Sequence, residues 1–234
     1  MTFDITKIPG IMRSKTWLNA ARLMDSWFSR PSGVAPAYGP PDTATIRMDT
    51  WVLRFPRARQ VYDQLIRERV WANVAAQREV GMMLRRKGLL AGAARPFGDL
   101  SRPVEMQDPD YVNYRVVSFG FSDLDDMSAA LGNFAFRVLI AGSVAPAPGG
   151  ARFPVTITEV GIYIRDSYDF NGDQDLGYWD DTDNSVSMIN PLSGTKVTNA
   201  DFRAWRAHNG RGGDFLVFSD VKRTTLRPPD SFLV

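Results

Sequence analysis

The stretch VTITEVGIYIRDSYDFNGDQDLGYW, residues 155–179, joins a β-strand pattern to an acidic segment. Its β-branched and aromatic residues indicate a strand that continues to about Tyr168. Asn171 and Gly172 then supply the two residues that a tight hairpin turn requires. The acidic segment therefore follows directly on a strand, and three interpretations of it are open: a hairpin turn, a metal loop and a catalytic site.

The chain around this stretch is rich in strand patterns. Further strands are expected within residues 111–119, 134–145 and 214–218, where β-branched and aromatic residues dominate. Two helices are expected between them, one over residues 122–132. The other begins with Thr198 or Asn199 as its N-cap and ends at Gly210.

The front of the chain has helical spacing instead. Residues 15–29 predict an amphipathic helix with Ser14 or Thr16 as its cap, and residues 57–87 predict one long helix that ends at Gly88. Between them, residues 31–43 contain too many prolines and glycines for regular structure and indicate a linker or an extended strap.

These patterns predict an α+β protein, because helices come first and strands follow. We expect a helical region over residues 1–95, packed on a β-rich domain over residues 100–234 that is barrel-like or a strongly twisted sheet. The first hundred residues carry 16 Lys and Arg against 8 Asp and Glu, and the remainder carries 12 against 18. No nucleic-acid fold signature accompanies this basic front, so a nucleic-acid partner is not expected.

Composition limits the possible chemistry. The chain has no cysteine and one histidine, which excludes thiolate nucleophiles, disulfides and histidine-rich metal sites. No apolar run is long enough to span a bilayer, and the start lacks the apolar region of a secretory signal. The sequence therefore predicts a globular protein made in the cytoplasm.

The metal interpretation depends on oxygen ligands at alternate positions. Asp169, Asn171, Asp173 and Asp175, with Asp180 at the twelfth place, follow the ligand spacing of a calcium loop. Gln174 occupies the place where such loops normally have glycine. Clustered carboxylates suit Ca²⁺ or Mg²⁺, because a divalent cation relieves their mutual repulsion.

The catalytic interpretation begins with Asp-Ser-Tyr-Asp, residues 166–169, at the strand end. An Asp-x-Tyr-Asp motif before an aromatic residue, in a β-rich part behind a helical one, resembles the activity domain of colicin M. That family hydrolyses lipid II at its pyrophosphate linkage and requires Mg²⁺. The resemblance implies catalytic roles for Asp166, Tyr168 and Asp169. The histidine and arginine that the family has a few residues later are absent here, where Asp175 and Leu176 stand.

A second resemblance covers nearly the whole chain. The strings WVLRFPRARQVYDQL, VWANVAAQREVGMMLRRKGLL, VGIYIRDSYDFNGDQDLGYW and FRAWRAHNGRGGDFLVFSDV are similar to an uncharacterised bacterial family often encoded near type VI secretion genes. This resemblance implies an antibacterial effector or an accessory of one, delivered to the periplasm of a target cell. The implied partners are a component of the secretion apparatus or a cognate immunity protein.

Three further residues are candidates for phosphate chemistry. His208 has the pKa range of a general acid or base, although it can equally be a helix-end residue. Arg211 lies in the GRGGD segment, residues 210–214, which forms either a phosphate-binding nest or a helix cap followed by a turn. Arg165 and Arg211 are the expected clamps on phosphate oxygens.

The leading hypothesis is a toxin that hydrolyses lipid II or another envelope pyrophosphate at a membrane surface with Mg²⁺. The rival is a non-enzymatic adaptor, chaperone or immunity protein of a secretion cluster, in which the acidic loop is a calcium-stabilised hairpin. A glycan hydrolase that uses two of these carboxylates is a third option and needs them roughly 5 to 9.5 Å apart.

Overall fold

The computed structural model describes residues 3–34, 39–120, 123–147 and 152–234. These form two compact units, each assembled from three segments of the chain. Unit 1 contains Met1–Ile46, Ser118–Phe134 and Asp166–Val217, and unit 2 contains Arg47–Val117, Ala135–Arg165 and Phe218–Val234. The mixture of helices and antiparallel sheets confirms the α+β class. Each unit takes residues from both the helical front and the β-rich back, whereas the expected division at residues 95–100 follows only the order of elements.

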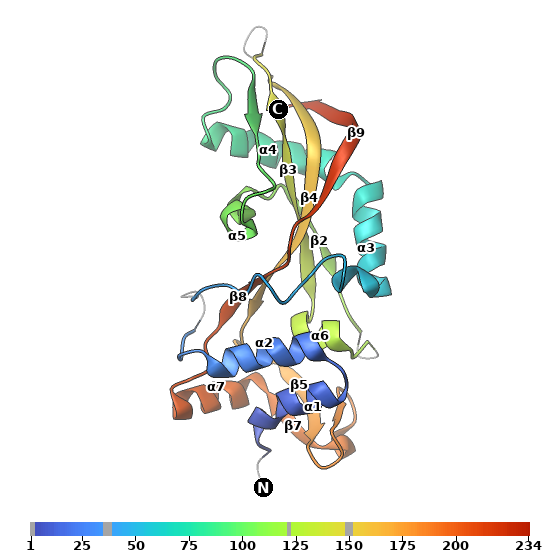
Figure 1. Cartoon of the computed structure of the whole chain (residues 1–234), viewed down its shortest axis with the longest axis vertical. Coiled ribbons are helices and arrows are strands. Elements are labelled where there is room, and N and C mark those ends of the chain that lie inside the picture. The colour runs from blue at the N-terminus through green and yellow to red at the C-terminus, as the bar shows by residue number, and fades with distance from the viewer. Residues whose placement is uncertain (1–2, 35–38, 121–122, 148–151) are drawn as a thin grey trace. The chain divides into compact units, whose positions relative to one another are not determined.

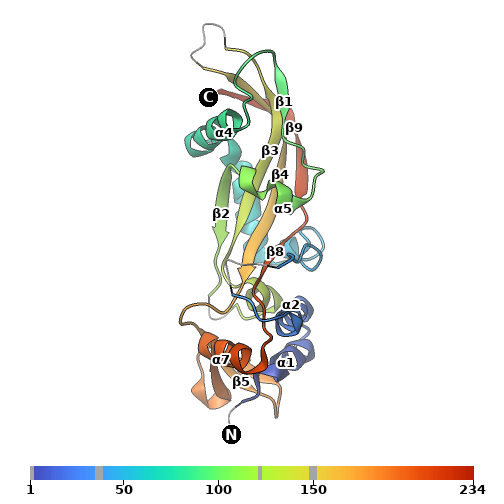
Figure 2. The same ribbon diagram turned by 90° about the vertical axis from the view of Figure 1, so that its left-hand side faces the viewer.

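The larger sheet is built on two long strands, β3 (Phe134–Val144) and β4 (Pro154–Tyr168), which pair antiparallel and run side by side (Figure 1, Figure 2). The strand order is β1-β3-β4-β8, with β2 paired to β3 and β9 paired to β4. The bounds of the other strands are β1 (Arg95–Phe97), β2 (Asn113–Val117), β8 (Phe215–Phe218) and β9 (Lys222–Leu233). The sheet is twisted, and the described strands do not close into a barrel, so only the twisted-sheet alternative is found.

Strand β9 is an element that the sequence patterns did not predict. Pro228 and Pro229 lie within it, and proline removes a donor from the hydrogen-bond ladder. The pairing with β4 shifts register at that point, from Thr225 opposite Glu159 to Asp230 opposite Ile157. The prolines therefore fall within the irregular part of the strand, where bulges accommodate residues that cannot pair.

The expected single helix over residues 57–87 is wrong in one respect. The structure has two helices, α3 (Pro56–Arg67) and α4 (Val74–Arg86). Between them Arg69 has φ 48°, in the left-handed region, and the Asn73 side chain accepts a hydrogen bond from the Ala76 amide. Both helices pack on β2. The helical spacing of apolar residues continues across this break, so the spacing alone does not predict two helices.

Unit 1 combines helices with a small sheet. Its elements are α1 (Ile8–Ser14), α2 (Leu18–Ser29), α6 (Asp126–Leu131), α7 (Asn199–Asn209), β5 (Asp175–Asp180), β6 (Ser185–Ser187) and β7 (Thr195–Thr198). The sheet order is β6-β5-β7, and α2 packs on both α1 and α6. A further short helix, α5 (Val104–Gln107), belongs to unit 2.

Helix α2 begins later than expected, and neither Ser14 nor Thr16 caps it. The Asp126 carboxylate of α6 instead accepts hydrogen bonds from the amides of Asn19 and Ala20, at 3.3 and 2.9 Å. A negative charge at a helix N-terminus is favourable, so α6 fixes the start of α2. Residue 122, the first of the predicted short helix, and residues 35–38 of the predicted strap lie outside the described residues.

The predicted Asn-Gly hairpin is corrected by the pairing of the strands. β4 ends at Tyr168 and Gly172 has φ 69°, as the sequence predicts. However, β5 pairs with β6 and β7 in the small sheet, and β4 pairs with β3 and β9 in the large one. The acidic segment is therefore a connection between two sheets.

Candidate functional site

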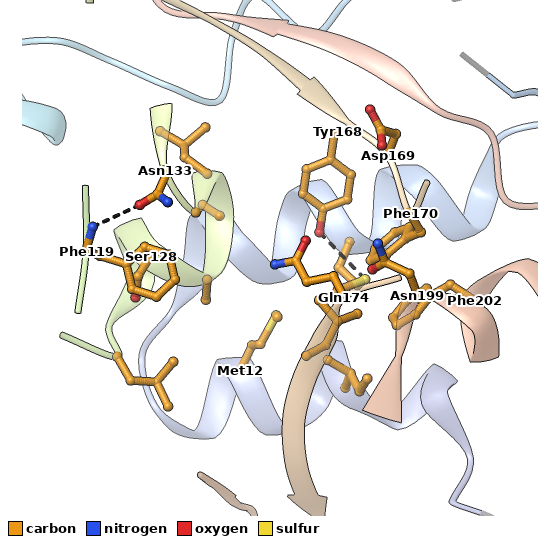
Figure 3. A pocket seen from close by; sticks show the side chains of 18 of the residues that line it. Met12, Phe119, Ser128, Asn133, Tyr168, Asp169, Phe170, Gln174, Asn199 and Phe202 are labelled. Atoms are coloured by element: carbon orange, nitrogen blue, oxygen red, sulfur yellow. Dashed lines mark hydrogen bonds between the residues drawn. The ribbon is translucent and has the colours of Figure 1, made fainter. Parts of the chain in front are cut away.

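The end of β4 forms one wall of a pocket within unit 1. Tyr168 is buried, and its ring lies edge-on to Phe170 at 5.8 Å and stacked on Phe215 at 5.2 Å between centroids. Its hydroxyl donates to the Met24 sulfur at 3.6 Å (Figure 3). Asp166 and Asp169 on either side of it are half-buried and line the same pocket. The structure therefore brings three of the four predicted catalytic residues to one cavity.

The pocket has a volume of about 380 Å³. Its aromatic lining comes from Trp17, Phe119, Tyr168, Phe170, Trp179 and Phe202. Its carboxylates come from Asp166, Asp169 and Asp175, and its side-chain amides from Asn133, Gln174 and Asn199. None of the described residues that line it is Lys, Arg or His. The pocket is thus a cavity of small-ligand size with mixed aromatic and polar walls, and the formal charges of its described lining residues are all negative.

Asp169 has a local structural role. Its carboxylate accepts a hydrogen bond from the Ser167 hydroxyl at 2.5 Å and another from the Asn171 amide at 3.1 Å. Such a side-chain-to-backbone bond two residues on stabilises a turn. Two of the four acceptor positions of this carboxylate are therefore occupied within the loop.

The predicted metal ligands are engaged separately. Asp173 pairs with Arg203 at 3.3 Å and Asp175 pairs with Lys196 at 2.9 Å, while Asp180 accepts from the Thr182 amide and hydroxyl at 2.7 and 2.6 Å. Within the described part of the chain, no group of three or more acidic or histidine side chains is arranged to hold a metal ion. These residues therefore do not fit a calcium or magnesium loop in this structure.

The Tyr168 phenol is in a dry environment. Burial raises its pKa well above the ordinary value, and the nearby negative charges of Asp166 and Asp25 raise the pKa further. The hydroxyl remains protonated at neutral pH. Tyr168 is consequently suited to shaping the pocket wall and not to transferring protons.

The other predicted residues do not line the pocket. His208 is exposed in the last turn of α7, near the negative end of the helix dipole. Arg165 belongs to unit 2, where its Nε lies 3.9 Å from the Asp108 carboxylate. Arg211 is exposed, and its backbone forms an isolated antiparallel β-bridge with Pro31. The pocket lining includes none of these three residues.

The glycine segment after α7 serves as a cap and a turn. Gly210 has φ 62° and ends the helix, as predicted. The next amides are bonded to carbonyls of the chain: Gly212 to Arg30 at 3.1 Å, and Gly213 to Trp27 at 3.1 Å. Because these amides are occupied, they form no nest for a phosphate.

Comparison with protein-family models shows which family the chain belongs to. The model of DUF6402, a family of unknown function, matches residues 3–196 and 193–233. The chain belongs to DUF6402. The same comparisons find no match to a curated protein or to a solved structure. Among the described residues of this DUF6402 chain, no helix is long and apolar enough to cross a membrane.

Asn199 and Gln174 are pocket residues that sequence reasoning missed. Asn199 is 2% exposed; its Nδ2 donates to the Asn171 carbonyl at 2.7 Å, and its Oδ1 has no donor among the described residues. Gln174 reaches into the pocket beside the Tyr168 ring (Figure 3). Asn199 is the first residue of α7, so its sequence context marked a helix start and hid its place in the pocket.

Proposed function

We propose that this DUF6402 protein is a non-enzymatic binding protein, an adaptor or chaperone of a bacterial secretion cluster. In this proposal its pocket in unit 1 receives part of a partner. The observation that carries the proposal is the pocket lining, whose described residues supply six aromatic rings and three carboxylates and include no Lys, Arg or His. Apolar cavities with a few polar groups are typical binding sites.

The charge of the pocket opposes a phosphate substrate. A phosphate anion roughly 6 Å from one carboxylate is repelled by about 3 kcal/mol at an effective dielectric constant near 20. Asp166, Asp169 and Asp175 line this cavity, and only Asp175 has a printed ion pair, with Lys196 at 2.9 Å; none of the described lining residues is itself a cation. Phosphoryl-transfer sites instead present arginine, lysine or a metal to the phosphate oxygens. The cavity is therefore better suited to a neutral or cationic ligand.

The biological setting of the proposal comes from the sequence resemblance to a family encoded near type VI secretion genes. In this proposal the protein is made in the bacterial cytoplasm and can be delivered to the periplasm of a target cell. The partner is then a component of the secretion apparatus or another protein of the same cluster. Such a role requires a docking site and no catalytic metal.

A pocket-blocking variant tests the binding function. Ala129 lines the pocket from α6, and Ala129→Phe fills part of the cavity, whereas Ala204→Phe places the same ring on the exposed face of α7. Each protein of the cluster is co-expressed singly with the wild type and both variants. A partner that co-purifies with the wild type and Ala204→Phe, but not with Ala129→Phe, supports the proposal. Equal recovery with all three forms contradicts it.

A second candidate function is hydrolysis of lipid II or another envelope pyrophosphate. One observation favours it: Asp166, Tyr168 and Asp169 of the Asp-x-Tyr-Asp motif line the same cavity. Export of the protein to the periplasm of a bacterial host tests this function. Toxicity that Asp166→Asn and Asp169→Asn abolish favours the hydrolase, while harmless export of a folded protein favours the binding protein.

A further inference from the structure

We infer that the occupant of the unit 1 pocket is an arginine side chain from a partner protein segment with apolar residues on either side. This inference rests on the proposed binding function and names its ligand class. Three properties of the cavity carry it: the sign of its charge, the chemistry of its walls and the apolar surface at its edge.

The charge of the cavity selects a cation. Asp166 and Asp169 are half-buried in the wall and carry the argument, because Asp175, at the start of β5, is exposed and paired with Lys196 at 2.9 Å. The hydrogen bonds from Ser167 and Asn171 hold the Asp169 carboxylate in place and leave two acceptor positions on its oxygens. A fixed carboxylate with free acceptor positions matches the planar fork of a guanidinium.

The walls distinguish arginine from lysine. Six aromatic residues line the cavity, and the delocalised guanidinium stacks on aromatic faces more readily than the strongly hydrated ammonium of lysine. The side-chain amide oxygen of Gln174 adds an acceptor to this wall, whereas that of Asn133 already accepts from the Phe119 amide at 3.0 Å. The buried Asn199 Oδ1, which has no donor among the described residues, adds a further acceptor in the same wall. Arginine has five donors to distribute among such acceptors, whereas lysine has three.

Exposed apolar residues that are next in the chain to lining residues favour a protein segment over a free small molecule. Leu18 is 62% exposed and directly follows the lining residue Trp17, and Ile189 is 73% exposed and directly follows the lining residue Met188. Exposed apolar side chains around a recessed site are typical of protein-binding surfaces. Interfaces in addition concentrate their binding energy in buried anchors, among which arginine is enriched.

Two capped tripeptides provide the direct test. Ac-Leu-Arg-Leu-NH2 and its citrulline counterpart differ only in the charge and donor set of the central side chain. Binding is followed by the intrinsic fluorescence of the protein, because Trp17 and Trp179 line the cavity. We expect the arginine peptide to bind at least about tenfold more tightly than the citrulline peptide, and the difference to shrink as salt is added.

Matched variants locate the effect. Asp166→Asn and Asp169→Asn each remove one charge from the wall. Each is expected to lower the affinity for the arginine peptide by about tenfold. Asp173→Asn is the control, because Asp173 belongs to the same acidic segment but does not line the cavity. Thermal unfolding of each variant shows that it is folded, so a loss of binding reports on the site itself.

Each outcome decides a separate point. Equal affinity for the two peptides overturns the arginine inference and leaves the binding function intact. If neither peptide binds, the inference is overturned as well. Equal binding of arginine amide and the tripeptide overturns the protein-segment part. A pocket-dependent partner that contains no arginine at its contact segment contradicts the inference independently, whereas failure of the proposed function appears as unchanged partner recovery with Ala129→Phe.

Discussion

Asp214 is a buried carboxylate in the core of unit 1. It is 3% exposed, accepts a hydrogen bond from the Trp27 indole at 2.9 Å and forms an ion pair with Arg206, which is 6% exposed. Arg206 also lies over the Trp27 ring at 5.1 Å. Removing only one partner of a buried ion pair strongly destabilises a protein, because the remaining charge stays buried without compensation.

Asp214→Ala is therefore expected to lower the free energy of unfolding by about 3 to 5 kcal/mol. Asp173→Ala, which removes the 99% exposed partner of Arg203, should change it by less than about 0.5 kcal/mol. Urea unfolding of the two variants and the wild type measures both values. Similar losses for the two would contradict the role assigned to the buried pair.

Tyr168 makes unfolding depend on pH in the alkaline range. Burial raises the pKa of its phenol, with the charges of Asp166 and Asp25 adding to the shift, so the folded protein holds this proton more tightly than the unfolded chain does. The stabilisation is fully present below the unfolded pKa near 10 and declines as the pH rises above it. Tyr168→Phe should therefore make the decline above about pH 10 shallower, by roughly 1.4 kcal/mol per pH unit. Chemical unfolding from about pH 8 to about pH 11 measures how the free energy of unfolding depends on pH in the wild type and in Tyr168→Phe. Identical slopes would count against a buried neutral phenol.

At the residue scale, the sequence predicted part of the candidate site. Asp166, Tyr168 and Asp169 were expected to gather at a strand end, and all three line the pocket. His208 and Arg211 were proposed from their chemistry alone, and chemistry does not report which side of a helix or turn a residue occupies. The pocket wall from α1 and α6 could not be predicted, because it depends on contacts between segments that are far apart in the chain.

The segment after α7 shows how backbone conformation and packing act together at the scale of an element. Gly210 and Gly212 both have positive φ, but only Gly212 lies against a side chain. A Cβ at Gly212 would lie 2.4 Å from the Trp27 ring, whereas a Cβ at Gly210 would meet nothing within 4 Å. The two positions therefore separate the cost of a left-handed conformation from the cost of a steric clash.

Gly210→Ala is expected to destabilise the protein by about 1 kcal/mol, the usual cost of an alanine in the left-handed region. Gly212→Ala should cost about 2 kcal/mol more, since it also forces a methyl group into the packed Trp27 ring. Thermal unfolding of the two variants compares them. A Gly212→Ala protein as stable as Gly210→Ala would refute the close packing of this turn.

Elements with strong local signals were predicted well. The Thr198 cap and Gly210 stop define α7, and residues rich in β-branched and aromatic types define β3 and β4. The break between α3 and α4 was missed because the apolar spacing continues across it. β9 was missed because its prolines argue against a strand, and only pairing with β4 accounts for them.

The two compact units do not follow the order of the chain, because each is assembled from three separate segments. Unit 1 requires Met1–Ile46 as well as later segments, and its core places Trp27 against Phe170 at 4.8 Å and against Phe202 at 5.4 Å. In unit 2, the Trp71 indole donates to Asp230 at 2.7 Å. The order of helix and strand in the sequence therefore predicts the α+β class, but not which segments share a core.

A fragment of residues 100–234 is expected to lack a cooperative thermal transition, because it lacks Trp27 and Trp71 and exposes the apolar surfaces that these residues cover. Circular dichroism and calorimetry of the fragment and the whole chain measure this difference. A sharp transition in the fragment, with a heat change in proportion to its length, would mean that the β-rich part is an independent domain.

The acid-lined pocket of unit 1 is proposed to bind a cation-bearing segment of a partner. The most direct measurement is a titration of the ¹⁵N-labelled protein with Ac-Leu-Arg-Leu-NH2, followed by nuclear magnetic resonance. The indole signals of Trp17 and Trp179, which line the pocket, should shift together with the backbone amides of Asp166 and Asp169, while the indole of Trp71 in unit 2 stays in place. Shifts confined to unit 2, or no saturable shift at the pocket signals, would show that the pocket does not bind this peptide.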